Sequence, residues 1–235
     1  MKKFLLDLKV TENCRLHKNY CLLKLTSDQM LPEMLPGQFV QVRVENSPTT
    51  FLRRPISVSD YDATTVTIIY KVVGSGTEQM RGMVAGEKLD ILTGLGNGFN
   101  TENEAKSPLL VGGGVGVPPL YNLAKRLLAE GKKPMVILGF NTKAEIFYEE
   151  EFKALGVETV ITRDEAVIAA ADRIILPGVG AFEDAVKKLR ESGMEKVVLE
   201  EAASGKPLLG ICLGMQMLLE KNYEYGEHEG LGLIK

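Results

Sequence analysis

The chain contains 235 residues, of which 45% are hydrophobic and 25% are charged, and its formal net charge is −3. This composition excludes an intrinsically disordered chain, and the length fits one large domain or two small ones. The apolar runs are too short to span a bilayer, and the first ten residues lack the apolar core of a signal peptide. Basic and acidic residues number 19 and 17 in residues 1–155, and 9 and 14 in residues 156–235. We therefore expect neither a membrane nor a nucleic acid as partner.

Cysteine and histidine are scarce. Three cysteines (Cys14, Cys21 and Cys212) in a chain of this length give no disulfide framework and are typical of a reducing compartment, so we expect a cytoplasmic protein. The two histidines, His17 and His228, lie far apart in the sequence. We therefore expect no metal site built from clustered His and Cys side chains.

The first hundred residues have a β pattern. Short segments of alternating apolar and polar residues are separated by sequences rich in Pro, Gly and Asn. The expected strands are Phe4–Val10, Tyr20–Thr26, Gln38–Val44, Thr65–Val73 and Lys88–Leu92. Five or six short strands at this spacing predict a small antiparallel β-barrel, which we assign to residues 1–100.

From about residue 107 the pattern alternates between buried strands and helices. The next segment, residues 101–155, contains strands at Pro108–Val111 and Met135–Phe140, a helix from Pro118 to Glu130 and a helix over Lys143–Leu155. This alternation predicts an α/β domain with a mainly parallel sheet. It continues through residues 156–235, with strands at Val157–Thr162, Arg173–Leu176 and Pro207–Ile211 and helices at Phe182–Ser192, Glu195–Ser204 and from Leu213 to about Lys221.

Two motifs in the expected barrel suit a phosphate-bearing ligand. Arg54-Pro55-Ile56-Ser57 places a guanidinium and a hydroxyl three residues apart, and both can donate hydrogen bonds to phosphate. The second motif, Ile69-Tyr70-Lys71-Val72-Val73-Gly74-Ser75-Gly76-Thr77, has glycines that allow close backbone approach to a pyrophosphate. Its Thr77 is expected to cap a helix over Glu78–Met83. Taken alone, the first motif equally fits a surface arginine at the end of a strand.

Together with Gly94-Leu95-Gly96-Asn97-Gly98-Phe99 and the glycine run after Val111, these motifs resemble the ferredoxin-reductase-like superfamily. Within it, residues 1–155 are most similar to the electron-transfer subunits of dihydroorotate dehydrogenase B. The resemblance implies FAD on the barrel and the catalytic dihydroorotate dehydrogenase subunit as partner. It places Arg54 and Ser57 at the phosphates, and Pro55 and Ile56 along the flavin. It also places Ile69, Tyr70 and Lys71 beside the cofactor, and Gly76 and Thr77 at the pyrophosphate.

The glycine run itself, Gly112-Gly113-Gly114-Val115-Gly116, is not a Rossmann fingerprint. The third glycine is missing, and no acidic residue follows the second strand at Phe140-Asn141. By resemblance it is the nicotinamide-side loop, with Gly113, Gly114 and Gly116 beside NAD(H). A plain turn from strand to helix is the alternative interpretation. The family also implies a [2Fe–2S] cluster held by four cysteines, a set that these 235 residues do not contain.

Residues 156–235 are similar to a second family. Ile174-Ile175-Leu176-Pro177-Gly178-Val179-Gly180 and Gly210-Ile211-Cys212-Leu213-Gly214 resemble class I glutamine amidotransferases, in particular the glutaminase subunits of imidazole glycerol phosphate synthase. The resemblance makes Cys212 a nucleophile at a turn from strand to helix and Gly178, Val179 and Gly180 an oxyanion loop. That family's His-x-Glu is expected beyond Lys235, and we expect His228 to be an ordinary solvated residue rather than its substitute.

The sequence therefore indicates a hybrid of two truncated proteins, and it leaves open whether the hybrid arises by gene fusion, by an assembly error or by laboratory design. Three functions follow. The favoured one is an FAD-binding, NADH-linked electron-transfer subunit of pyrimidine biosynthesis. The alternatives are a glutaminase of histidine biosynthesis with an incomplete triad, and a folded hybrid without turnover.

Overall fold

The computed structural model describes residues 2–44, 51–102, 106–140, 143–160, 164–170, 174–178 and 181–235. The chain forms two compact units. The first, here the barrel unit, comprises Met1–Pro108, Gly114–Met135 and Phe140–Thr159, and the second, the sheet unit, comprises Leu109–Gly113, Val136–Gly139 and Val160–Lys235. Within the described ranges, no helix has the length and apolarity that crossing a membrane requires.

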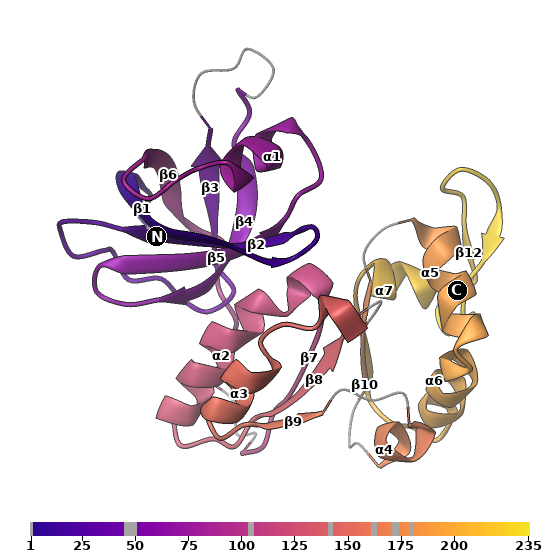
Figure 1. Ribbon diagram of the computed structural model, residues 1–235. Helices are drawn as coiled ribbons and strands as arrows, with labels where there is room; N and C mark the ends of the chain where they lie inside the picture. Colours follow the sequence, from indigo (N-terminus) through magenta and orange to yellow (C-terminus); the bar gives the residue numbers. More distant parts are fainter. Residues whose placement is uncertain are drawn as a thin grey trace. The chain divides into compact units, whose positions relative to one another are not determined.

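A closed six-stranded barrel dominates the barrel unit, as the alternating pattern predicts (Figure 1). Its strands follow the order β1-β2-β5-β4-β3-β6, and every neighbouring pair is antiparallel. The strands are β1 (Phe4–His17), β2 (Tyr20–Thr26), β3 (Phe39–Arg43), β4 (Arg54–Tyr61), β5 (Thr65–Lys71) and β6 (Lys88–Leu95). Strand β4 contains the predicted Arg-Pro-Ile-Ser motif but has no counterpart among the predicted strands, and β1 extends seven residues past the predicted Phe4–Val10.

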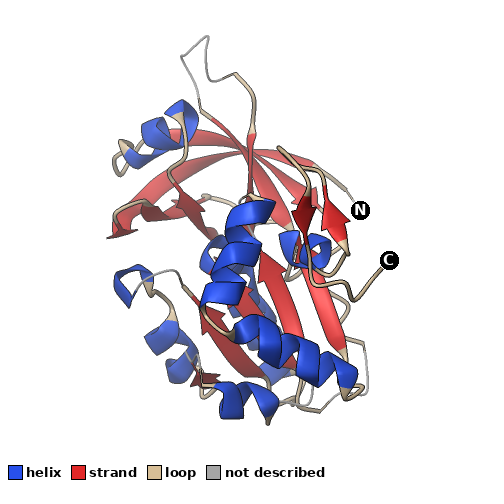
Figure 2. Cartoon of the chain, turned by 90° about the vertical axis from the view of Figure 1, so that its right-hand side faces the viewer, coloured by secondary structure: helices blue, strands red, loops and turns tan. Residues whose placement is uncertain are grey.

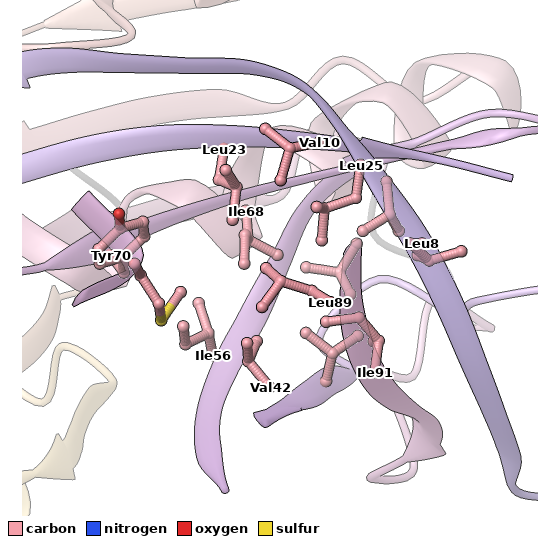
Figure 3. Packing of buried hydrophobic residues seen from close by; sticks show 14 of the residues in the cluster. Leu8, Val10, Leu23, Leu25, Val42, Ile56, Ile68, Tyr70, Leu89 and Ile91 are labelled. Atoms are coloured by element: carbon pink, nitrogen blue, oxygen red, sulfur yellow. The ribbon is translucent and has the colours of Figure 1, made fainter. Parts of the chain in front are cut away.

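Alternate residues of these strands fill the barrel (Figure 3). Leu23 and Leu25 of β2 meet Val66 and Ile68 of β5, and all four side chains are completely buried. Because side chains of a strand point alternately to its two faces, the residues between them face outward. The outward faces of β4 and β5 are therefore separate from the barrel core, and they are largely covered by other parts of the chain, since Ser59, Thr67 and Ile69 are buried there.

The short helix α1 (Ser75–Arg81) follows β5 and is held from β1. The Asn13 side-chain amide donates hydrogen bonds to the carbonyls of Met80 at 2.9 Å and Met83 at 2.7 Å. These carbonyls lie at the C-terminal end of α1, where backbone acceptors lack partners within the helix. Asn13 therefore fixes α1 against the barrel, although the helix begins three residues earlier than the sequence predicts.

Helix α2 (Pro118–Ala129) packs against β4, and Lys125 of α2 forms an ion pair with Asp60 of β4 at 2.6 Å. The predicted single helix over Lys143–Leu155 is wrong. The structure has a 3-10 turn, η2 (Lys143–Glu145), and a separate helix, α3 (Glu149–Ala154). The break occurs at Tyr148, which adopts a left-handed conformation with φ of 66° and is buried together with Phe147. Burial of the two aromatic rings thus overrides the helical pattern.

The sheet unit contains a parallel pair of strands, β10 (Ile174–Gly178) and β11 (Leu208–Cys212). Strands β7 (Leu109–Gly113), β8 (Met135–Gly139) and β9 (Glu158–Val160) form a sheet in that order. Helices lie between successive strands in this part of the chain, with two of them in succession between β10 and β11 (Figure 2). The helices are α4 (Glu165–Ala169), α5 (Phe182–Glu191), α6 (Met194–Ala203) and α7 (Leu213–Met217), and the last elements are β12 (Lys221–Asn222) and β13 (His228–Glu229). Helix α7 is thus shorter than predicted, because the chain turns into the β12–β13 hairpin.

A small core holds these helices together. Phe182 of α5, which is completely buried, packs in one cluster with Val198 of α6 and with Leu213 and Met217 of α7. Leu231, after β13, closes the same cluster. The C-terminal segment is therefore part of a packed core rather than a loose extension of the chain.

Candidate functional site

The two motifs predicted to bind phosphate meet in the structure. The guanidinium of Arg54, at the start of β4, lies against the backbone of Gly76 in the first turn of α1. A Cβ atom at Gly76 would lie 2.1 Å from Nε of Arg54, a distance that no side chain can occupy. Only glycine at position 76 lets the charged group sit there. Arg54 also donates a hydrogen bond to the carbonyl of Leu52.

Thr77 has a local role that differs from the predicted cap. It is the third residue of α1, whose N-cap is Gly74. Its hydroxyl oxygen accepts hydrogen bonds from the backbone N–H of Val73 at 3.0 Å and of Gly74 at 3.2 Å, and it donates to the Gly74 carbonyl at 2.9 Å. Thr77 therefore shapes the turn before the helix, and the prediction that it is the capping residue is wrong.

The other residues of the first motif occupy both faces of β4. Ile56 is buried in the barrel core, and Val58 follows it there. Ser57 lies between them, is half-buried and pairs with Phe39 of β3. Pro55 is exposed and pairs with Gln41. Ser57 thus has the outward orientation that a ligand contact needs, whereas Ile56 contributes from the core side.

The three predicted residues of β5 are divided in the same way. Tyr70 lies in the barrel core, where it is visible among the packed side chains in Figure 3, and burial raises the pKa of its hydroxyl. Ile69 and Lys71 flank it, so they point to the opposite, outward face. Ile69 is buried there and Lys71 is exposed. Of the three, only Ile69 and Lys71 present their side chains to the outer surface of β5.

The glycine run after β7 reaches this surface. The turn η1 (Gly114–Gly116) contacts β5, and Gly114 has a left-handed φ of 50°. A Cβ atom at Gly114 would lie 3.0 Å from the hydroxyl oxygen of Tyr20. Tyr20 is the cross-strand neighbour of Lys71, whose Nζ lies 5.8 Å from the centroid of the Tyr20 ring. The structure thus brings the predicted flavin-side Lys71 and the predicted nicotinamide-side Gly114 to one tyrosine, while Gly113 remains in β7.

An aromatic cluster that was not predicted lies on the same outer surface. The Tyr20 ring lies 5.3 Å from that of Phe147, and the Tyr148 ring lies 4.9 Å from that of Tyr121, between centroids. The Tyr148 hydroxyl forms a 3.0 Å hydrogen bond with the Ser59 hydroxyl of β4. Five aromatic residues within a stretch of 32 positions, at 121, 140, 147, 148 and 152, were the available signal.

The adjacent residues Arg53 and Arg54 have different partners, which was not predicted. The guanidinium of Arg53 donates to both carboxylate oxygens of Asp90, at 2.8 and 2.7 Å, and Asp90 is buried. Arg43 approaches the same carboxylate at 3.6 Å. Arg53 is therefore a structural partner of β6, whereas Arg54 reaches α1. The sequence Leu-Arg-Arg-Pro contains no signal that distinguishes them.

The third glycine motif, Gly94–Phe99, closes the end of the barrel. Gly98 adopts a φ of 74°, and the Phe99 N–H donates to the Pro36 carbonyl at 2.7 Å. The buried Gln38 side chain accepts from the Leu35 N–H at 2.9 Å and donates to the Gly96 carbonyl at 2.8 Å. The motif thus joins two loops, which are held together by left-handed glycines and by the buried Gln38 amide.

The predicted nucleophile Cys212 is the last residue of β11, and α7 begins directly after it. Its Cα is paired with that of Gly178 at the end of β10. A Cβ atom at Gly210 would lie 2.4 Å from Cα of Met215, so the strand and the helix turn back on each other tightly. The backbone therefore has the predicted strand–turn–helix form. Val179 and Gly180 of the predicted oxyanion loop lie outside the described residues.

His228, Cys14 and Cys21 are less exposed than their polar sequence neighbours suggest. The prediction that His228 is solvated is wrong: its ring is half-buried 6.4 Å from that of Phe182, and its Nε2 atom is buried without a hydrogen bond in the described part of the chain. Cys14 is half-buried in β1 and Cys21 is buried in β2, and burial raises the pKa of both thiols. Both cysteines thus belong to strands of the barrel.

The closed antiparallel barrel with a glycine-rich turn against its outer face defines a ferredoxin-reductase-like fold. The structure matches phthalate dioxygenase reductase, which transfers electrons from pyridine nucleotides to [2Fe–2S], with a TM-score of 0.65 and 18% identity over 87% of this chain and 67% of that protein.

Sequence similarity to curated relatives shows which family within this fold the chain belongs to. The electron transfer subunit of dihydroorotate dehydrogenase B (NAD(+)) from Fusobacterium nucleatum is 40% identical over 188 residues, which is 78% of this chain and 69% of that protein. The corresponding subunit from Bacillus mycoides is 44% identical over 151 residues, or 63% of this chain and 58% of that protein. The chain belongs to the family of dihydroorotate dehydrogenase B electron transfer subunits, and it spans about three fifths to two thirds of the length of these relatives.

A second similarity covers the C-terminal region. Residues 141–235 match the family of CobB/CobQ-like glutamine amidotransferase domains. The alignment with the Fusobacterium protein includes 78% of this chain and therefore extends past residue 155 wherever it starts. The reductase-type and amidotransferase-type similarities thus overlap rather than meeting at one position.

Proposed function

We propose that this chain is an FAD-binding subunit that takes electrons from NADH and passes them to a catalytic dihydroorotate dehydrogenase subunit. The observation that carries the proposal is the contact of Arg54 with Gly76, which joins the two phosphate-type motifs at one place on the barrel. A guanidinium held against a helix turn that has no side chain suits a pyrophosphate. Family membership supplies the class of cofactor.

The described residues fit FAD in this position. Arg54, Ser57, Gly76 and Thr77 would hold the phosphates, and Pro55, Ile69 and Lys71 would line the flavin, with Ile56 and Tyr70 supporting them from the core. Gly113, Gly114 and Gly116 would lie on the nicotinamide side. When bound, the flavin accepts a hydride and can release electrons singly. The protein's own contribution is to hold the flavin face accessible and to keep the two nucleotides adjacent.

An iron–sulfur cluster does not fit these residues. Four thiolates are needed, and the 235 residues contain three cysteines, two of which lie in barrel strands. We therefore assign no step to such a cluster within this chain.

We further propose a division of the chain into three parts. Residues 1–100 form the FAD domain, residues 101–155 begin a nucleotide-binding α/β domain, and residues 156–235 form an amidotransferase-like segment. The α/β part has a mainly parallel sheet.

The test is an absorbance spectrum of the purified protein before and after addition of FAD and removal of the excess. We expect flavin bands with about one FAD per chain. Anaerobic addition of NADH should then bleach the band near 450 nm. A protein that remains colourless after incubation with FAD contradicts the proposal.

A second function has one specific observation in its favour. The tight β11–α7 turn at Gly210 and the match over residues 141–235 are typical of an amidotransferase nucleophile, here Cys212. Glutamate release from glutamine, measured with Cys212→Ala as control, tests it. We expect no steady release, because His228 is the one histidine in residues 156–235 and its ring packs near Phe182. Activity that disappears in Cys212→Ala would make the glutaminase the better assignment.

A further inference from the structure

Tyr20 differs from the other buried tyrosine of the barrel strands. Its side chain is 4% exposed, yet it is not part of the barrel core that contains Tyr70. It stands at the start of β2 with its hydroxyl beside Gly114 of the glycine-rich turn. A tyrosine from the barrel thus reaches the segment in which the nicotinamide side is proposed.

The ring of Tyr20 is fixed from two directions. Phe147 packs against it with 5.3 Å between ring centroids, and the Lys71 ammonium lies 5.8 Å from its centroid. A ring held by an aromatic neighbour and a cation has little rotational freedom. The direction of the hydroxyl is therefore set by packing.

This hydroxyl makes no hydrogen bond to any residue in the described ranges. The residue is buried, but its oxygen is not fully enclosed, so the hydroxyl is available to a ligand that approaches the turn. Burial and the negative charge of Glu145 both raise the pKa of Tyr20. The group is consequently protonated at neutral pH and is able to donate.

The Tyr20 hydroxyl approaches the turn closely because residue 114 is glycine. A Cβ atom there would stand 3.0 Å from the Tyr20 oxygen, and φ of 50° is a conformation that side-chain-bearing residues rarely adopt. The turn also follows β7 directly, and nucleotides bind outside the carboxyl ends of strands in open α/β sheets.

We propose that Tyr20 is a binding residue for the nicotinamide dinucleotide, with its hydroxyl donating a hydrogen bond to the nucleotide held at Gly114–Gly116. The inference rests on the proposed function and adds a residue outside the glycine-rich turn. Tyr20 therefore contributes to NADH affinity and not to FAD affinity.

The test compares Tyr20→Phe with Tyr148→Phe in the FAD-loaded protein. Both changes remove one hydroxyl from the same aromatic cluster, but the Tyr148 hydroxyl is already bonded to Ser59 at 3.0 Å. Binding of NAD⁺ and of FAD is measured separately by isothermal titration calorimetry. We expect Tyr20→Phe to weaken NAD⁺ binding about three- to ten-fold, as loss of one neutral hydrogen bond implies, with FAD binding unchanged. Tyr148→Phe should change neither affinity.

Gly114→Ala is the second variant and should weaken NAD⁺ binding at least as much, again with FAD retained. Unchanged NAD⁺ affinity in Tyr20→Phe overturns the inference, as does a wild-type protein that binds FAD but no NAD⁺. A wild-type protein that binds NAD⁺ but no FAD contradicts the proposed function and leaves the Tyr20 comparison measurable. If Tyr20→Phe does not fold, unchanged NAD⁺ affinity in Gly114→Ala overturns the inference.

Discussion

The guanidinium of Arg54 lies where a side chain at Gly76 would have to be, since a Cβ atom at position 76 would come within 2.1 Å of Arg54 Nε. The two residues come from different motifs, one at the start of β4 and the other in the first turn of α1. Their contact links the barrel wall to the helix that follows β5. The proposed phosphate site therefore requires glycine, which has no side chain, at position 76.

The first prediction concerns Gly76→Ala. The new methyl group must displace Arg54, so we expect FAD binding to weaken about ten-fold or more. Isothermal titration calorimetry with FAD measures the effect. The matched control is Gly74→Ala, because a Cβ atom at Gly74 meets nothing within 4 Å and its φ of −172° suits any residue. Equal affinities in the two variants would show that the Arg54–Gly76 contact does not serve the ligand.

The second prediction separates Arg54 from Arg53. Arg54→Ala should weaken FAD binding by one to two decades, as loss of a charge-assisted phosphate contact of about 1.5–3 kcal/mol implies, with little change in stability. Arg53→Ala should instead lower the free energy of unfolding by about 2–4 kcal/mol, because it removes the nearer of the two arginines on the buried Asp90 carboxylate and leaves the more distant Arg43. Urea denaturation of the apoprotein and FAD titration distinguish the two. Loss of FAD affinity in a fully stable Arg53→Ala would reverse the assignment.

Much of the barrel could be predicted from the sequence, because alternating residues such as Leu23 and Leu25 report directly which face of a strand is buried. The meeting of Arg54 and Gly76 could be expected only through resemblance, since no local pattern brings β4 to α1. Arg53 could not be separated from Arg54, because its partner Asp90 is 37 residues away. The break at Tyr148 was equally hidden, since it accompanies the burial of the Phe147 and Tyr148 rings, and Tyr148 bonds to Ser59 of a distant strand.

The third prediction concerns the thiols. Thiolate is the reactive form, and burial raises the pKa of Cys14 and of Cys21. We therefore expect iodoacetamide at pH 8 to label both of them slowly in the folded protein, and to label Cys212 first, as its sequence position predicts. Mass spectrometry of tryptic peptides after timed quenching gives the rates. Raising the pH should accelerate labelling of Cys14 and Cys21. Faster labelling of Cys21 than of Cys212 at pH 8 would contradict the prediction.

The last prediction concerns the alkaline stability that Tyr148 controls. Burial raises the pKa of Tyr148 to about 12, while the hydrogen bond with Ser59 opposes that shift. In the unfolded chain a tyrosine has a pKa of about 10, so the unfolded state releases its proton first as the pH rises. The stabilising contribution is therefore complete below pH 10 and is lost between about pH 10 and 12, by about 2–3 kcal/mol.

Urea denaturation at pH 8 and at pH 11.5 measures this loss against Tyr148→Phe. The variant should be less stable than the wild type by about 1 kcal/mol at pH 8, because the Ser59 bond is missing, and the difference should shrink or reverse at pH 11.5. Ser59→Ala is the control, because it removes the same hydrogen bond but keeps the buried phenol, and it should retain the alkaline loss. A difference between wild type and Tyr148→Phe that is the same at both pH values would show that Tyr148 ionises as easily in the folded chain as in the unfolded one.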